Sequence, residues 1–183
     1  MPRPDQSLYD YAGGAPSMLA LAEAFHRRCL VDPLLQHPFS RPGQHPKHVE
    51  RLAAYWTQML GGGPAYTDLG AGQSYLMRIH LGEGGANEQY RAAFVRCFDG
   101  AVEDADLPAD PDFRQALHDS QVWAAEYLMP DHDDPAQVPE GLAVPVWTWD
   151  GRRGGRDGSG GSEAGRGQIC SPNGAPPIAS SLT

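Results

Sequence analysis

Three histidines in this sequence, His26, His48 and His80, each fall on the apolar stripe of a different predicted helix. An imidazole that faces a protein core needs a partner, because burying an unpaired polar group costs on the order of a few kcal/mol. Phe39 lies between the first two histidines in the chain and adds an aromatic side chain to the group. Three inward-facing histidines on three helices predict a pocket that holds a metal or a cofactor.

Two kinds of metal site suit this pattern. Haem iron takes one axial imidazole and presents its other face to a distal pocket with apolar walls. His80 ends a short predicted helix just before a glycine, so it can reach an iron, with His26, Phe39 and His48 on the opposite face. The alternative is a helical-bundle enzyme in which all three histidines converge within about 2 Å of one zinc or non-haem iron. A third interpretation is a helical interaction module without a cofactor, in which each histidine has a local partner.

The elements that position these residues are all predicted to be helices. Apolar residues recur at helical spacing, and glycine and proline clusters separate the periodic segments. A short turn of helix is expected from Pro33, ended by Pro38 and Phe39. Short segments are also expected at about 7–11 and 73–80, and longer helices at about 15–31, 47–60, 87–104 and 110–129.

The C-terminal part of the chain differs from the helical body. Residues 130–150 are rich in proline and predicted to be extended, with Trp147 and Trp149 strapping them to the helices. Residues 151–183 are rich in glycine, serine and proline and contain no aromatic residue. Such a composition cannot bury enough apolar area to offset the entropy of ordering. We therefore expect one domain over residues 1–150 and a disordered tail over 151–183.

Composition excludes some classes of partner. The net charge of −9 and the isoelectric point near 5.1 argue against non-specific binding to nucleic acid or to an anionic membrane. No run approaches the roughly 18 apolar residues of a membrane helix, and the N-terminus lacks the apolar core of a signal peptide, so we expect a cytoplasmic protein. Cys29 and Cys97 are expected to be reduced, buried thiols, and the absence of a CxxC motif disfavours a thiolate zinc site.

Several motifs together resemble one known family. They are YAGG (11–14), FHRRCLVDPLLQHPF (25–39), QHPKHVERLAAYW (44–56), GGP (62–64), HLGEG (80–84) and VPVWTWDG (144–151). The chain resembles truncated haemoglobins of the second group, in their actinobacterial form, over about residues 9–150. The resemblance implies an all-α, two-over-two helical sandwich around haem b.

The resemblance also implies roles for particular residues. His80 takes the position of the proximal iron ligand, with its other ring nitrogen held by a backbone carbonyl or water. His48 takes the distal position, and His26 stands where many relatives carry a tyrosine, which brings an imidazole that can titrate near neutral pH. Phe94 falls near the position at which members of the second group carry a tryptophan, so the hydrogen-bond donor of that tryptophan is missing here. Ala93 is a competing alignment for the same position. The expected contacts to haem are Phe39, Leu52, Tyr55, Leu76, Arg78, His80 and Phe94.

The function implied by the resemblance is the binding of oxygen at haem iron. Nitric oxide and carbon monoxide are further candidate ligands, and the implied roles are oxygen binding or transfer, or the removal of nitric oxide or peroxide. An unidentified reductant and a monomer or homodimer are expected. No enzyme activity follows from the residues themselves.

Overall fold

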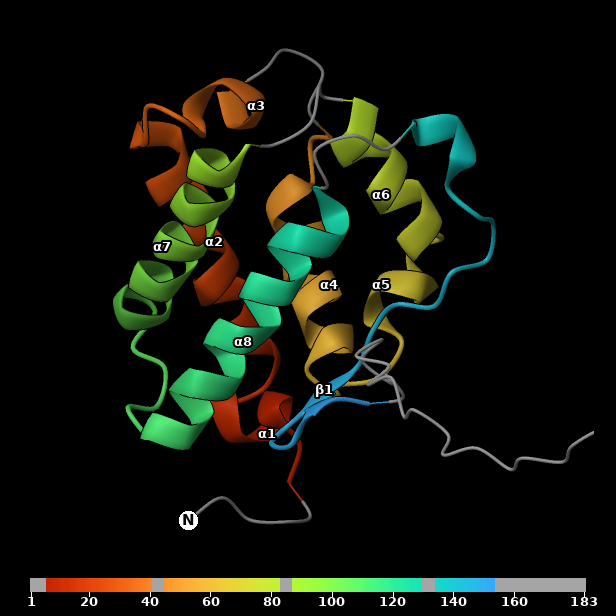
Figure 1. The fold of residues 1–183 in the computed structure, drawn as a ribbon. Helices are drawn as coiled ribbons and strands as arrows, with labels where there is room; N and C mark the ends of the chain where they lie inside the picture. Colours follow the sequence, from red (N-terminus) through yellow and green to blue (C-terminus); the bar gives the residue numbers. More distant parts are fainter. Residues whose placement is uncertain (1–5, 41–44, 83–86, 130–133, 154–183) are drawn as a thin grey trace, which may run out of the picture.

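The computed structural model describes residues 6–40, 45–82, 87–129 and 134–153. Helices dominate these residues, followed by one turn of 3-10 helix, η1, and a two-residue antiparallel hairpin, β1 with β2 (Figure 1). The elements are α1 (Leu8–Ala12), α2 (Ala15–Val31), α3 (Gln36–Ser40), α4 (His48–Met59), α5 (Ala65–Asp68), α6 (Gln73–Gly82), α7 (Glu88–Asp104), α8 (Pro111–Leu128), η1 (Pro135–Gln137), β1 (Trp147–Thr148) and β2 (Gly151–Arg152).

Two pairs of helices form the body of the molecule. Helix α2 packs against α4, helix α7 packs against α8, and α2 also packs against α7 (Figure 1). Phe25 of α2 is fully buried where the pairs meet, with edge-on contacts to the rings of Phe39, Trp56, Phe94 and Phe98. This arrangement confirms the predicted all-α, two-over-two sandwich.

Capping residues explain where several helices begin. The side chain of Asn87 accepts a hydrogen bond from the Tyr90 amide at 2.9 Å, so α7 begins directly after it. Asp110 caps α8 in the same way through the Phe113 amide at 2.9 Å, and Pro111 occupies the first helical position. Helices α7 and α8 therefore begin at the positions that the sequence predicted. Helix α2 also has the predicted bounds.

Three local elements differ from the prediction. Pro38 and Phe39 do not end the short helix but lie inside α3, because proline is tolerated in a first turn, where its missing amide hydrogen has no intrahelical acceptor. Helix α5 was not predicted, since its four residues are too few to show a period. The third difference is the hairpin of β1 and β2, which was not predicted.

The predicted strap is confirmed. The indole Nε1 of Trp149 donates to the Gln6 carbonyl at 2.8 Å, and its ring meets that of Tyr11 edge-on at 4.9 Å. Trp147 is buried, 6.2 Å from the ring of Trp123 on α8. The strap thereby joins the C-terminal segment to both α1 and α8. The tail predicted to be disordered lies, from residue 154 onward, outside the described residues.

Two further predictions concern thiols and membranes. Cys29 and Cys97 are buried and free, as expected. None of the helices in the described part of the chain is long and apolar enough to cross a membrane.

Candidate functional site

A cavity of about 640 Å³ lies among α3, α4, α6, α7 and the end of α8, within the range of cofactor sites. Most of its walls are aromatic or aliphatic. The lining residues are Phe25, Pro38, Phe39, His45, Pro46, His48, Arg51, Leu52, Tyr55, Tyr66, Tyr75, Leu76, Ile79, His80, Tyr90, Phe94, Leu128 and Met129. A larger hollow of about 840 Å³ between α7 and α8 is more open to solvent and contains none of the predicted site residues, so we place the site in the smaller cavity.

His80 lies in the last turn of α6 and lines the cavity. Its Nδ1 is 2.9 Å from the carbonyl oxygen of Leu76, which also lines the cavity. A carbonyl only accepts, so Nδ1 carries the proton and Nε2 keeps its lone pair. This is the arrangement in which protein imidazoles bind a metal, since the second hydrogen bond fixes the tautomer and the ring.

His26 and His48 come together on the α2–α4 side of the site. Their ring centroids are 5.5 Å apart, and the Phe39 ring lies 5.8 Å from His26 and 5.7 Å from His48. His48 lines the cavity, whereas His26 lies behind it. The Nδ1 of His26 and the Nε2 of His48 are buried, and neither has a hydrogen-bond partner among the described residues. Since only His48 lines the cavity, its Nε2 is the nitrogen available to a molecule bound there.

Burial lowers the pKa of both distal imidazoles. For His48 the pKa falls to about 4, first through burial and then through the positive charges of His26, His80, His45 and Arg51 when they are protonated. Burial also lowers the pKa of His26. The cause is the same for both residues, because an imidazolium in either position would lose hydration.

Four other predicted contacts line the cavity: Leu52, Tyr55, Leu76 and Phe94. Phe94 also packs on Phe25 with ring centroids 5.0 Å apart, whereas its alignment competitor, Ala93, is fully buried and does not line the cavity. The hydroxyl of Tyr55 is buried without a hydrogen-bond partner in the described part of the chain. Because burial raises the pKa of Tyr55, the phenol keeps its proton and the wall stays uncharged.

Arg78 does not line the cavity. Its Nη2 donates to the Val138 carbonyl at 2.8 Å and pairs with a Glu140 carboxylate oxygen at 2.8 Å, so it anchors the C-terminal strap. Arg51 supplies a cation at the cavity instead, with its guanidinium carbon 5.6 Å from the centre of the Tyr66 ring. Arg51 follows His48 by three residues on α4, and this helical spacing is a signal that sequence reasoning missed.

The residues present fit a haem better than a directly ligated ion. No group of three histidine, cysteine or acidic side chains that could hold a metal ion occurs in the described ranges, which leaves the three-histidine alternative without a site. One free imidazole nitrogen on α6, apolar walls, and unpartnered buried nitrogens near α4 match the needs of haem ligation.

Comparison with known proteins agrees with this geometry. The model of the bacterial-like globin family matches residues 7–125. A search of curated proteins finds no match. Among solved structures, a thermostable haemoglobin from the actinobacterium Thermobifida fusca is 25% identical, with a TM-score of 0.58 over 70% of this chain and 100% of that one.

Two further solved structures share the fold at lower identity. The haemoglobin of Chloroflexus aurantiacus is 22% identical, with a TM-score of 0.59 over 68% of this chain and 98% of that one. The group II truncated haemoglobin of Bacillus anthracis is 19% identical, with a TM-score of 0.60 over 72% and 97% of the two chains. The chain therefore belongs to the bacterial-like globin family, as a haem-binding globin with the fold of the second-group truncated haemoglobins.

Proposed function

We propose that this globin holds haem b in the cavity between α4 and α6, with His80 Nε2 as the proximal ligand, and binds oxygen. The observation that carries the proposal is the 2.9 Å contact from His80 Nδ1 to the Leu76 carbonyl, which leaves Nε2 free. Haem b, when bound, supplies an iron with an open coordination position for a diatomic gas.

On the proximal side, the chain fixes the orientation of one imidazole. The Leu76 carbonyl holds the Nδ1 proton of His80 and thereby makes Nε2 the stronger donor to a metal. Leu52, Phe39 and Phe94 provide apolar walls to the cavity. Arg51, rather than Arg78, is the arginine placed to meet the carboxylates at the edge of a haem.

On the distal side, neutral imidazoles provide hydrogen bonding without charge. In the tautomer that carries its proton on Nε2, His48 can donate to a polar gas molecule in the cavity. We propose that His48 donates this hydrogen bond to bound oxygen. Nitric oxide and carbon monoxide are similar in size and enter the same cavity. The proposal also requires an electron donor that keeps the iron reduced.

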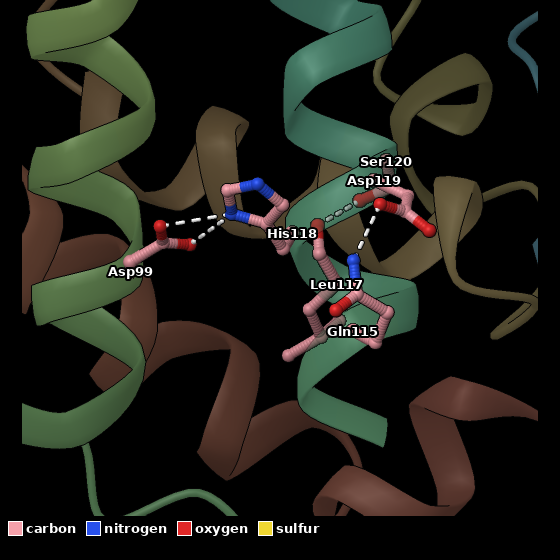
Figure 2. A network of polar contacts seen from close by, with 6 residues as sticks. All are labelled: Asp99, Gln115, Leu117, His118, Asp119 and Ser120. Atoms are coloured by element: carbon pink, nitrogen blue, oxygen red, sulfur yellow. Dashed lines mark hydrogen bonds and ion pairs between the residues drawn. The ribbon is translucent and has the colours of Figure 1, made fainter. Parts of the chain in front are cut away.

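The test replaces the proximal imidazole. His80→Ala should lower haem retention at least tenfold, and added imidazole should restore the absorption spectrum, because the free base can occupy the vacated space. His118→Ala is the matched control, since Figure 2 shows His118 on α8 turned toward Asp99, with Nδ1 2.9 Å from a carboxylate oxygen and outside the cavity lining. Unchanged haem retention and an unchanged spectrum in His80→Ala would contradict the assignment of His80 as the proximal ligand.

A further inference from the structure

Two cysteines lie where α2 packs against α7, outside the cavity lining. Cys29 of α2 is fully buried, Cys97 of α7 is 6% exposed, and both are free thiols. The proposed haem site uses neither of them. Two free thiols on packed helices can form a disulfide where the backbone brings their sulfurs together.

Contacts on one side bring Cys97 against the end of α2. Nη2 of Arg96 pairs with Oδ2 of Asp32, the residue that follows α2, at 2.8 Å. The thiol of Cys97 donates to the same Oδ2 at 3.9 Å, as a weak sulfur donor does. Cys29 precedes Asp32 by three residues, which is about one helical turn. Cys97 therefore contacts an oxygen that lies one turn along the chain from Cys29.

Contacts on the other side hold α2 close to the next turn of α7. Arg28, which directly precedes Cys29, pairs through Nε with Oδ2 of Asp104 at 2.7 Å. Its guanidinium fills the space that a side chain at Gly100 would need, and Gly100 follows Cys97 by three residues. The two thiols lie between these two fixed contacts of α2 with α7. A hydrogen bond between Cys29 and Cys97 agrees with this placement.

We propose that Cys29 and Cys97 form a redox-active dithiol, which hydrogen peroxide oxidises to an intramolecular disulfide between α2 and α7. The sulfur of Cys97 attacks one peroxide oxygen, the O–O bond breaks, and the hydroxide that leaves takes the thiol proton to form water. The sulfur of Cys29 then attacks the sulfenic acid at Cys97, the S–O bond breaks, and a second water leaves with the proton of Cys29. Two thiols and one hydrogen peroxide thus give one disulfide and two waters, and the sulfurs supply both electrons.

The surroundings of the two thiols assign their order of reaction. Burial raises the pKa of Cys29, and the charge of Cys97 and a hydrogen bond to it raise this pKa further. Burial and then Asp32 also raise the pKa of Cys97. This rise is opposed by the charges of Arg96 and Arg28 and by the hydrogen bond that Cys29 donates. Because the thiolate is the form that attacks an oxidant, Cys97 reacts first and Cys29 resolves the intermediate.

Peptide mass spectrometry of the full chain tests the proposal. The reduced protein, with any bound haem held as its carbon monoxide complex, is treated with a small excess of hydrogen peroxide, and remaining thiols are blocked before digestion without reductant. The native chain should yield the Cys29 peptide joined to the Cys97 peptide, and dithiothreitol should separate them. The control variant Cys170→Ser removes the third cysteine of the chain and should keep this cross-link.

Two results would overturn the proposal. One is a native chain in which Cys29 and Cys97 stay free under conditions that convert free cysteine to cystine in a parallel sample. The other is a disulfide that joins either residue to Cys170 instead. Both are read on the native chain, so neither depends on whether a variant folds. A chain that binds haem and carbon monoxide but forms no cross-link keeps the haem function and loses the dithiol, and a cross-link in a chain that binds no haem does the reverse.

Single variants test the order of the two steps. In Cys29→Ser no second thiol resolves the intermediate, so dimedone should trap a sulfenic acid at Cys97 that the native chain does not accumulate. In Cys97→Ser the thiol of Cys29 should stay unmodified, because it loses the partner that reacts first. A dimedone adduct on Cys29 in Cys97→Ser, with none on Cys97 in Cys29→Ser, would contradict the assigned order.

Discussion

At the scale of single residues, burial decides the charge state of the site. His48 and His26 have lowered pKa values because an imidazolium in their positions would lose its hydration. The unfolded chain has no such restriction, and its histidines titrate near 6.5. Proton binding therefore differs between the folded and unfolded states in the acid range.

This difference predicts an acid-sensitive free energy of unfolding. Between pH 6.5 and about 4 the unfolded state binds a proton at His48 that the folded state excludes, so the haem-free protein loses stability as the pH falls through this window. Above pH 6.5 both states are neutral and the contribution vanishes. Urea denaturation at pH 7 and pH 5 should show a loss about 1 kcal/mol smaller in His48→Leu than in the native protein, allowing for partial exposure of the ring. An equal loss in both proteins would contradict the lowered pKa.

The same scale shows which site residues the sequence could predict. His80, His48 and Phe39 were recognisable because core-facing imidazoles are costly and because their motifs resemble a known family. The contacts of Arg78 were not predicted, since its partners, Val138 and Glu140, lie about sixty residues away and leave no local signal. The lowered pKa of His26 was also out of reach, because burial depends on the packed structure.

At the scale of elements, capping residues and apolar periodicity predicted the long helices well. Helix α8 illustrates this agreement, with Asp110 as its cap and Pro111 in its first turn. The short elements α3 and α5 were misjudged or missed, because five and four residues are too few to define a period. Tyr66 of α5 lines the cavity, so missing α5 also meant missing this residue.

Capping makes a quantitative prediction for α8. Asp110→Ala removes the acceptor of the Phe113 amide and should lower the free energy of unfolding by about 1 kcal/mol. Asp112→Ala is the matched control, because Asp112 is an exposed acid in the same first turn whose loss affects only the helix dipole, worth about 0.3–1 kcal/mol at the surface. Chemical denaturation compares the two variants. A loss for Asp110→Ala no larger than that for Asp112→Ala would contradict the capping assignment.

At the scale of the whole molecule, two pairs of helices form the body, and a C-terminal strap packs on them. The strap joins distant parts of the chain, since Trp149 donates to the Gln6 carbonyl and Arg78 of α6 donates to the Val138 carbonyl. Arg78 therefore ties the helix that carries His80 to the C-terminal segment. The two tryptophans predicted that the C-terminal segment packs on the helices. The hairpin of β1 and β2 was not predicted, because it depends on pairing across a turn.

The most direct test of a haem cavity with an open ligand position is an absorption spectrum. The native full chain, expressed with haem supply and purified, is measured oxidised and then reduced under carbon monoxide. A strong Soret band that shifts with carbon monoxide is the predicted result, since in the proposed function His80 Nε2 would hold the iron and the cavity would leave room for a gas ligand. A spectrum without a Soret band, unchanged by added haem, would contradict the assignment of this cavity to haem.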